Sequence, residues 1–154
     1  MLDRLSVALA TFFGIGRLPW APGTWGSLAG LAISWFFFLD HPYRLLTAAA
    51  LLFAVSVPAC TRAEALMGEK DPSSVVVDEV VGMMVSMAFL PAPHGYFALI
   101  AFILFRLFDI WKPWPWKKLQ YLPGGWGILV DDVGAGLYAV LFLQVGRIAL
   151  SAVV

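Results

Sequence analysis

The amino-acid sequence predicts an all-α, polytopic membrane protein with about five spanning helices. A further N-terminal interfacial helix is a candidate, and residues 1–154 form one integral-membrane domain. Hydrophobic residues make up 61% of the chain and charged residues 13%, against roughly 45–50% and about 25% in soluble domains. The mean hydropathy is +0.85. The apolar residues stand in long uninterrupted runs, which exclude the alternating pattern of a membrane barrel.

The charge balance and the cysteine content narrow the class of protein further. The formal net charge is +0, so the chain lacks the phosphate-neutralising surface that nucleic-acid binding requires. Its single cysteine, Cys60, lies in an apolar run and is predicted to be a small packed hydrophobe. The N-terminal apolar run is followed by GIGRLPWAPGTWGS rather than a cleavage site, so we expect it to remain in the mature protein.

The first half of the chain contains two predicted spans and one shorter apolar segment. A spanning helix needs about 20 residues, so Leu5–Gly16 is expected to be interfacial or re-entrant. Arg17–Trp25 (RLPWAPGTW) is rich in proline and glycine and is predicted to be a loop. Ser27–Leu39 spans the bilayer if its helix begins near residues 23–25. Leu45–Thr61 is uncharged from end to end, and Pro58 inside it predicts a kink that neighbouring helices can accommodate.

The third predicted span carries two acids near its start. Arg62–Ser74 is polar, and its DPSS end predicts an N-cap at Asp71 with proline in the first helical turn. A role of Asp71 as a ligand is the alternative. Val75–Leu90 is the apolar segment that follows, and Asp78 and Glu79 interrupt it.

The last two spans flank the most charged part of the chain. Tyr96–Trp111 is the fourth span, and KPWPWKKLQYLPGGWG follows it as a predicted loop. The fifth span, Val133–Leu150, is headed by Asp131 and Asp132.

The distribution of charge predicts the topology. If each span crosses once, eight of the ten Lys and Arg residues lie on the side of the N-terminus, and only Arg44 and Arg147 lie opposite. The positive-inside rule makes the first side cytoplasmic. Nine of the ten acids lie on the same side. The segments Arg17–Ser27, Asp71–Glu79 and Arg106–Asp132 are therefore expected to converge at the cytoplasmic membrane face.

Two pairs of adjacent acids are candidates for chemistry. A carboxylate at the centre of a membrane helix costs roughly 2.5–3.5 kcal/mol, so Asp78 and Glu79 are expected to have a partner or a function. The alternative is that both begin a helix at headgroup depth, where acids favour the helix dipole. One cap would suffice at the next pair, Asp131 and Asp132. Two adjacent carboxylates repel each other, and a divalent cation commonly resolves that repulsion.

Arg106 and Asp109 stand three residues apart and therefore share one face of a helix. The alternative to a functional role is that they form a purely structural ion pair. The KPWPWKK stretch after them is typical of an interfacial anchor on anionic lipid. The residues assigned to this anchor are Trp114, Trp116, Lys117 and Lys118.

Together the acids and cations predict a metal-assisted enzyme acting on a phosphate-bearing lipid headgroup. Oxygen ligands without clustered His or Cys favour a hard ion such as Mg²⁺, and arginine and lysine suit phosphate. The chain has no Cys-x5-Arg loop and no D-G-x-x-A-R run. His41 and His94 are both expected at the opposite face, which argues against a histidine nucleophile.

Three segments give the chain a specific resemblance. They are GIGRLPWAPGTWGSLAG, DPSSVVVDEVVGMM and FRLFDIWKPWPWKKLQYLPGGWGILVDDVGAG, and they resemble the phosphatidylglycerophosphatase A family of bacterial membrane lipid phosphatases. The resemblance implies Mg²⁺-dependent hydrolysis of phosphatidylglycerol phosphate to phosphatidylglycerol and phosphate. It also implies a multi-pass protein of the bacterial cytoplasmic (inner) membrane, with the phospholipid substrate and the bilayer as its partners.

The resemblance also carries residue roles onto this sequence. The catalytic and metal-binding acids it implies are Asp78, Glu79, Asp109, Asp131 and Asp132. The substrate-phosphate contacts it implies are Arg17, Thr24, Arg106 and Lys112.

Alternatives remain open at this point. A membrane transporter or channel with an acidic cation site would line a path across the bilayer with charge, whereas nearly all charge here is expected at one face. A structural subunit with a lipid-binding basic rim would not need its acids. If the chain is an enzyme, a carboxylate nucleophile that forms an aspartyl phosphate is the alternative to direct attack by water.

Overall fold

The computed structural model describes residues 1–90 and 94–151, and across these residues the fold is all-α, as predicted, with no strand. The elements are α1 (Leu2–Ala10), η1 (Ile15–Arg17), α2 (Pro22–Ile33), η2 (Ser34–Phe38), α3 (Pro42–Met67), α4 (Val77–Met87), α5 (His94–Trp111), α6 (Trp116–Leu119) and α7 (Gly125–Ser151).

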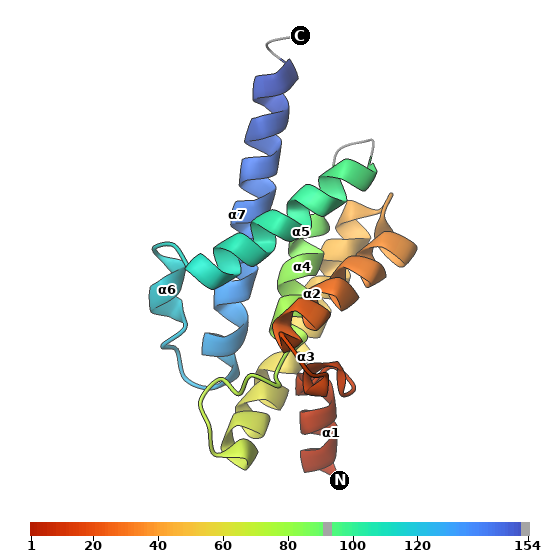
Figure 1. Ribbon diagram of the computed structural model, residues 1–154. Coiled ribbons are helices and arrows are strands. Elements are labelled where there is room, and N and C mark those ends of the chain that lie inside the picture. The colour runs from red at the N-terminus through yellow and green to blue at the C-terminus, as the bar shows by residue number, and fades with distance from the viewer. Residues whose placement is uncertain (91–93, 152–154) are drawn as a thin grey trace.

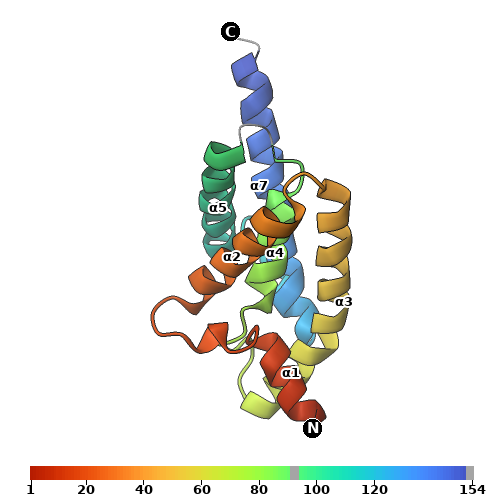
Figure 2. The ribbon, with the colours of Figure 1, turned by 90° about the vertical axis from the view of Figure 1, so that its right-hand side faces the viewer.

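Helix α4 is the centre of the fold (Figures 1 and 2). It is surrounded by α2, α3, α5 and α7, and each of them packs against it. Every residue of α4 except Glu79 is buried. The apolar character of its sequence, VDEVVGMMVSM, explains this position, because a helix that is hydrophobic all round is stable only inside a bundle. The acids at its N-terminal end are thereby carried into the interior.

Glycines allow neighbouring helices to pack with their backbones close to that of α4. A Cβ atom added at Gly82 of α4 would lie 2.6 Å from both the Phe105 ring and the Asp132 carbonyl oxygen. A Cβ atom added at Gly30 of α2 would lie 2.6 Å from the Val80 carbonyl oxygen. Small residues at helix contacts allow this close approach. The side chains at the beginning of α4 are therefore brought near those of α2 and α7.

Two helices are long and apolar enough to cross a membrane, Pro42–Met67 and Gly125–Ala149. Both expose large apolar side chains, such as Leu51 on α3 and Phe142 on α7. The other predicted spans correspond to shorter helices, with 12 residues in α2, 11 in α4 and 18 in α5. The helical character of all five predicted spans is confirmed, while length supports spanning for two of them.

Helix α7 begins well before the predicted Val133, so Asp131 and Asp132 do not head the helix but lie inside it. The reason is that the PGGWG segment packs against α3 and does not form a separate turn before the helix. The Gly125 N–H donates a hydrogen bond to Thr61 Oγ1 at 2.8 Å, and a Cβ at Gly125 would collide with the Val57 backbone. Glycine here serves the contact between α7 and α3.

The predicted N-cap at Asp71 is wrong. Helix α4 begins only at Val77, and Asp71 adopts a left-handed conformation with φ 50°. The segment between them is a turn tied to α1, because the Val76 N–H donates to the Ala10 carbonyl at 3.0 Å. The polar segment before it is also partly helical, since α3 continues to Met67 and ends at Gly68, which has φ 69°.

Candidate active site

A cavity of about 350 Å³ lies where α2, α4 and α7 begin and α5 ends. It brings together the three distant segments that the charge pattern predicted to converge, and that convergence is confirmed. The residues that line it are Ala21, Pro22, Gly23, Asp71, Pro72, Ser73, Val75, Asp78, Glu79, Arg106, Asp109, Lys112 and Asp132.

Three carboxylates among the lining residues form a cluster. Asp78 and Glu79 come from the first turn of α4 and Asp132 from α7, and one oxygen of each lies within 4.8 Å of the others. Asp78 is 7% exposed and Asp132 2%. Each of the three has an oxygen atom without a hydrogen-bond partner: Asp78 Oδ1, Glu79 Oε2 and Asp132 Oδ2. Buried carboxylates normally have partners, so this cluster fits a bound cation.

The oxygen-only composition of the cluster indicates which cation. Hard ions such as Mg²⁺ prefer carboxylate oxygens and commonly share their coordination with substrate phosphate. A softer ion would be expected to find His or Cys. The cluster that can hold a metal consists of Asp78, Glu79 and Asp132 alone within the described part of the chain. These residues therefore fit the magnesium that the sequence predicts.

Arg106 joins three helices beside the acids. Its Nη1 lies 2.6 Å from Asp109 Oδ2 and 3.9 Å from Glu79 Oε1. The same nitrogen lies 3.4 Å from Ser27 Oγ on α2. The predicted pairing of Arg106 with Asp109 on one face of α5 is confirmed. The guanidinium also reaches outside its own helix, so this pair does more than stabilise α5.

Lys112, directly after α5, forms an ion pair with Asp131 of α7. Burial by itself would lower the pKa of Lys112, but the charges of Asp131, Asp132 and Asp109 outweigh it and raise the pKa above its ordinary value. Lys112 therefore remains a cation at physiological pH. Asp131 is buried but does not line the cavity, and its contribution is to hold the ammonium group at the cavity wall.

The lining contains five acids against two cations. With these groups ionised, the excess of negative charge would repel a phosphate dianion. An added divalent cation reverses that balance and leaves Arg106 and Lys112 to contact phosphate oxygens. The cavity can then hold a phosphomonoester next to carboxylates.

Two of the predicted phosphate contacts do not line this cavity. Arg17 lies in η1 and lines a different cavity beside α1. Thr24 is in the first turn of α2, next to the lining residue Gly23. The remaining predicted residues are brought together, with Asp131 reaching the site through Lys112.

Gly23 was not predicted as a site residue. A Cβ there would collide with Glu79 Oε1 and lie 3.1 Å from Arg106 Nη1, so glycine lets α2 begin directly over the site. Gly23 belongs to the APGTWGS motif, but from the sequence it predicted only a turn. Asp71, predicted as a cap, also lines the cavity.

The residues of the predicted interfacial anchor differ in their exposure. Trp114 and the two lysines of α6 are exposed. Trp116 packs inward instead, with its ring against Tyr138 at a centroid distance of 6.0 Å and against the position of Gly134. It supports the packing of α6 on α7.

Comparisons with known proteins agree with the geometry. A family model described as phosphatidylglycerophosphatase A matches residues 8–147. Two curated relatives carry the name phosphatidylglycerophosphatase A. The one from Haemophilus influenzae is 41% identical over 86% of this chain and 83% of its own length. The one from Escherichia coli is 36% identical over 84% and 76%. A Bacteroides thetaiotaomicron relative, provisionally named a phosphatidylinositol-3-phosphatase, is 40% identical over 93% and 94%. No solved structure matches the chain.

Proposed function

Because the chain belongs to the phosphatidylglycerophosphatase A family of enzymes, we propose that it hydrolyses phosphatidylglycerol phosphate to phosphatidylglycerol and inorganic phosphate. This reaction belongs to glycerophospholipid biosynthesis. The observation that carries the proposal is the cavity in which Asp78, Glu79 and Asp132 meet Arg106 and Lys112. The names of the two phosphatidylglycerophosphatase A relatives support the choice of substrate. Membership of an enzyme family leaves no reason to favour a transporter or channel.

The acids divide into two roles in this proposal. Asp78, Glu79 and Asp132 would hold Mg²⁺, which when bound supplies positive charge to the phosphate and acidifies a water molecule. Asp109 and Asp131 were predicted as ligands too, but each engages a cation. We assign to them the positioning of Arg106 and Lys112.

The two cations would bind the phosphate. Arg106, near the end of α5, and Lys112, directly after it, line the same cavity as the acids. Charge on the non-bridging oxygens of a phosphoryl group is stabilised by fixed cations in the transition state. Because each cation is already held by an aspartate, little reorganisation is needed when the phosphate arrives.

The location follows from the charge pattern. The lipid substrate presents its headgroup at a membrane face, and α3 and α7 are long enough to cross the bilayer. The excess of Lys and Arg on the side of the N-terminus supports a cytoplasmic active site in the bacterial inner membrane. A phosphate at headgroup depth would then reach the cavity without leaving the bilayer.

Two chemical routes lead to the products. Water can attack phosphorus directly, or a cavity carboxylate can form an aspartyl phosphate that water then hydrolyses. Brief incubation with ³²P-labelled substrate, followed by acid quench and hydroxylamine, distinguishes the two. A hydroxylamine-sensitive phospho-enzyme supports the covalent route, and its absence during steady turnover supports direct attack.

A second substrate is favoured by one observation. The Bacteroides thetaiotaomicron relative is provisionally named a phosphatidylinositol-3-phosphatase and matches this chain over nearly all of its length. Both headgroups carry a phosphomonoester, which is the group the cavity is built to hold. The difference between them lies in the leaving alcohol, glycerol or inositol.

A substrate panel tests the proposal. The purified full chain in non-ionic detergent would be given phosphatidylglycerol phosphate, phosphatidylinositol 3-phosphate and phosphatidic acid at equal micellar mole fraction with Mg²⁺, and phosphate release measured. We expect the highest kcat/KM with phosphatidylglycerol phosphate. A higher kcat/KM with phosphatidylinositol 3-phosphate would make that lipid the substrate instead. Phosphate release from none of the three lipids would overturn the phosphatase assignment. Asp40→Asn, in the exposed turn before α3, is the matched control variant.

A further inference from the structure

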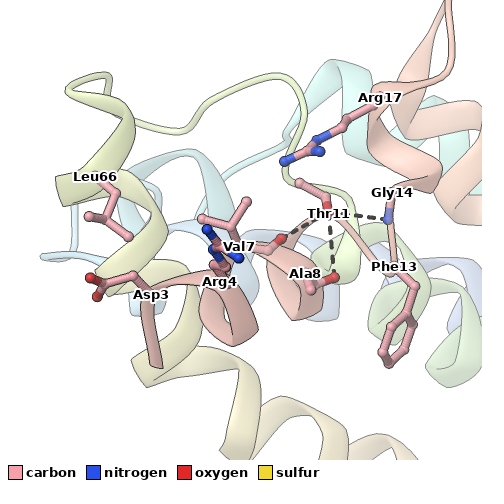
Figure 3. Close-up of a pocket in the computed structure, with 9 residues that line it drawn as sticks. All are labelled: Asp3, Arg4, Val7, Ala8, Thr11, Phe13, Gly14, Arg17 and Leu66. Carbon is pink, nitrogen blue, oxygen red and sulfur yellow. Dashed lines mark hydrogen bonds between the residues drawn. The ribbon is translucent and has the colours of Figure 1, made fainter. Parts of the chain in front are cut away.

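A second cavity of about 580 Å³ lies beside α1, between the chain leaving that helix and the end of α3 (Figure 3). It shares no residue with the catalytic cavity. Two arginines line it, Arg4 on α1 and Arg17 on η1, together with apolar side chains such as Val7 and Leu66. Its charge is therefore opposite in sign to that of the catalytic cavity.

A tight reversal of the backbone builds this cavity. After α1 the chain passes through three left-handed residues, Phe12, Phe13 and Gly14, with φ of 44°, 56° and 94°. The Thr11 hydroxyl holds the reversal by donating to the Val7 carbonyl at 2.8 Å and accepting from the Gly14 N–H at 3.2 Å. Residues in strained left-handed conformations are retained where the surrounding structure fixes them. The consequence is that Arg17 returns over α1.

Neither arginine has a counter-ion among the residues that the structure describes. Asp3 also lines the cavity, but its carboxylate is paired with Arg62 Nε at 2.8 Å. Within residues 1–90 and 94–151, the ion pairs of the structure include neither Arg4 nor Arg17. Figure 3 shows the Arg17 side chain extending from its loop toward the side of the cavity where Arg4 lies. Two unpaired guanidinium groups on one cavity are complementary to a phosphate.

Exposed apolar side chains stand at this cavity and on the opposite face of α1. Phe13, which lines it, is 78% exposed. Leu2 and Leu5 are exposed as well, on the face of α1 turned away from the cavity, because successive helical residues point about 100° apart. Trp20, after η1, is also exposed. Apolar side chains on one face of a short helix with arginines beside them are typical of segments that lie in the membrane interface. A free phosphate would satisfy the arginines but leave the Phe13 side chain at the same cavity in water.

We propose that this cavity is a second lipid site, which binds the headgroup phosphate of an anionic glycerophospholipid with Arg4 and Arg17 while Phe13 contacts its glycerol and acyl region. The site is separate from catalysis and independent of which lipid phosphate the enzyme hydrolyses. It would hold α1 against an anionic leaflet, on the side of the membrane where the N-terminus lies.

The test uses a lipid that the catalytic cavity is not built to hold. Dihexanoylphosphatidylserine is an anionic phosphodiester, so it lacks the phosphomonoester that the acid-lined cavity would bind. Calorimetric titration of the full chain in non-ionic detergent should show binding of this lipid. Divalent cations are chelated in these titrations, so that the acid-lined cavity repels phosphate. Dihexanoylphosphatidylcholine and inorganic phosphate, each titrated alone, should then bind at least ten-fold more weakly.

Variants connect the binding to this cavity. Arg4→Gln and Arg17→Gln should each weaken phosphatidylserine binding several-fold, and together at least ten-fold. Arg44→Gln combined with Arg147→Gln removes two exposed arginines elsewhere and should leave the affinity unchanged. Phe13→Ala should weaken binding of the lipid.

Three outcomes would overturn the proposal. These are unchanged affinity in both single arginine variants, equal affinity for phosphatidylcholine, and equal affinity for inorganic phosphate, which would make this a free-anion site. Because the arginine side chains are exposed, the single variants are expected to fold, and their melting temperatures in detergent check this.

Discussion

The two cavities each present two cations, but they hold them differently. In the acid-lined cavity Arg106 and Lys112 are partly buried, and each is paired with an aspartate. In the α1 cavity Arg4 and Arg17 are exposed and enter none of the ion pairs among the described residues. Pairing fixes the position of a charge, which transition-state stabilisation needs. Unpaired, exposed charge keeps its mobility and suits the binding of a lipid headgroup.

The two cavities also differ in how many carboxylates they contain and in whether these are paired. The acid-lined cavity concentrates carboxylates, several of which have oxygens without a hydrogen-bond donor. The α1 cavity has one, Asp3, already neutralised by Arg62. Repelling carboxylates reduce the stability of the metal-free protein, so they are expected where function requires them. The contrast predicts that variants of the two cavities will separate activity from lipid binding.

The largest expected effect is that of Asp132→Asn. It removes one of three clustered oxygen ligands, and we expect hydrolysis to fall by about 10³-fold or more. It also removes repulsion between buried carboxylates, so the melting temperature of the metal-free protein should rise. Phosphate release and thermal unfolding in detergent measure the two effects, with Asp40→Asn as control. Lost activity with a lower melting temperature would instead indicate a structural role.

Arg106→Gln comes next, with an expected loss of about 10²-fold in kcat/KM because a fixed transition-state contact disappears. Arg106→Lys keeps the charge but not the planar guanidinium, which contacts both Asp109 and Glu79. It should recover only part of the activity. If Arg147→Gln, on an exposed part of α7, reduced activity equally, Arg106 would lose its special role.

Gly23→Ala should reduce activity by about ten-fold to 10²-fold, because small displacements of catalytic groups have effects of this size. The added Cβ would displace Glu79 and Arg106. Gly146→Ala places a Cβ in open space on α7 and should leave kcat unchanged. Equal activity of the two variants would show that α2 does not constrain the site.

The smallest effect is that of salt. Raising NaCl from about 0.05 M to about 0.5 M should weaken phosphatidylserine binding at the α1 cavity several-fold, because exposed charges are screened over a few ångströms at that ionic strength. The KM for the substrate should change less, because Arg106 and Lys112 are partly buried. The reverse order would remove the distinction drawn between the two cavities.

Much of the fold could be predicted from the sequence, because apolar runs without charge specify helices and the polar breaks separate them. The convergence of three charged segments followed from alternating the spans. Helix ends could not be predicted in the same way. PGGWG contains residues typical of turns, yet Gly125 is glycine because α7 packs on the backbone of Val57. That contact exists only in the tertiary structure.

The candidate site was predictable in its residue types and less so in their roles. The adjacent pairs Asp78–Glu79 and Asp131–Asp132 resemble each other in sequence, but the second pair divides, with Asp132 in the acid cluster and Asp131 on Lys112. Successive helical residues point about 100° apart, and only the packing decides what each one meets. Arg17 was implied as a phosphate contact by the family resemblance, and in the structure it follows the chain reversal at Gly14 and lines the α1 cavity.

The central claim is that the acid-lined cavity performs metal-dependent hydrolysis of a lipid phosphomonoester. Its most direct test is a Mg²⁺ titration of phosphate release from phosphatidylglycerol phosphate after chelation, with wild type, Asp132→Asn and Asp40→Asn in parallel. We expect no release without the metal, saturable recovery in wild type and Asp40→Asn, and almost none in Asp132→Asn. Full activity of chelated wild type, or of Asp132→Asn, would contradict the claim.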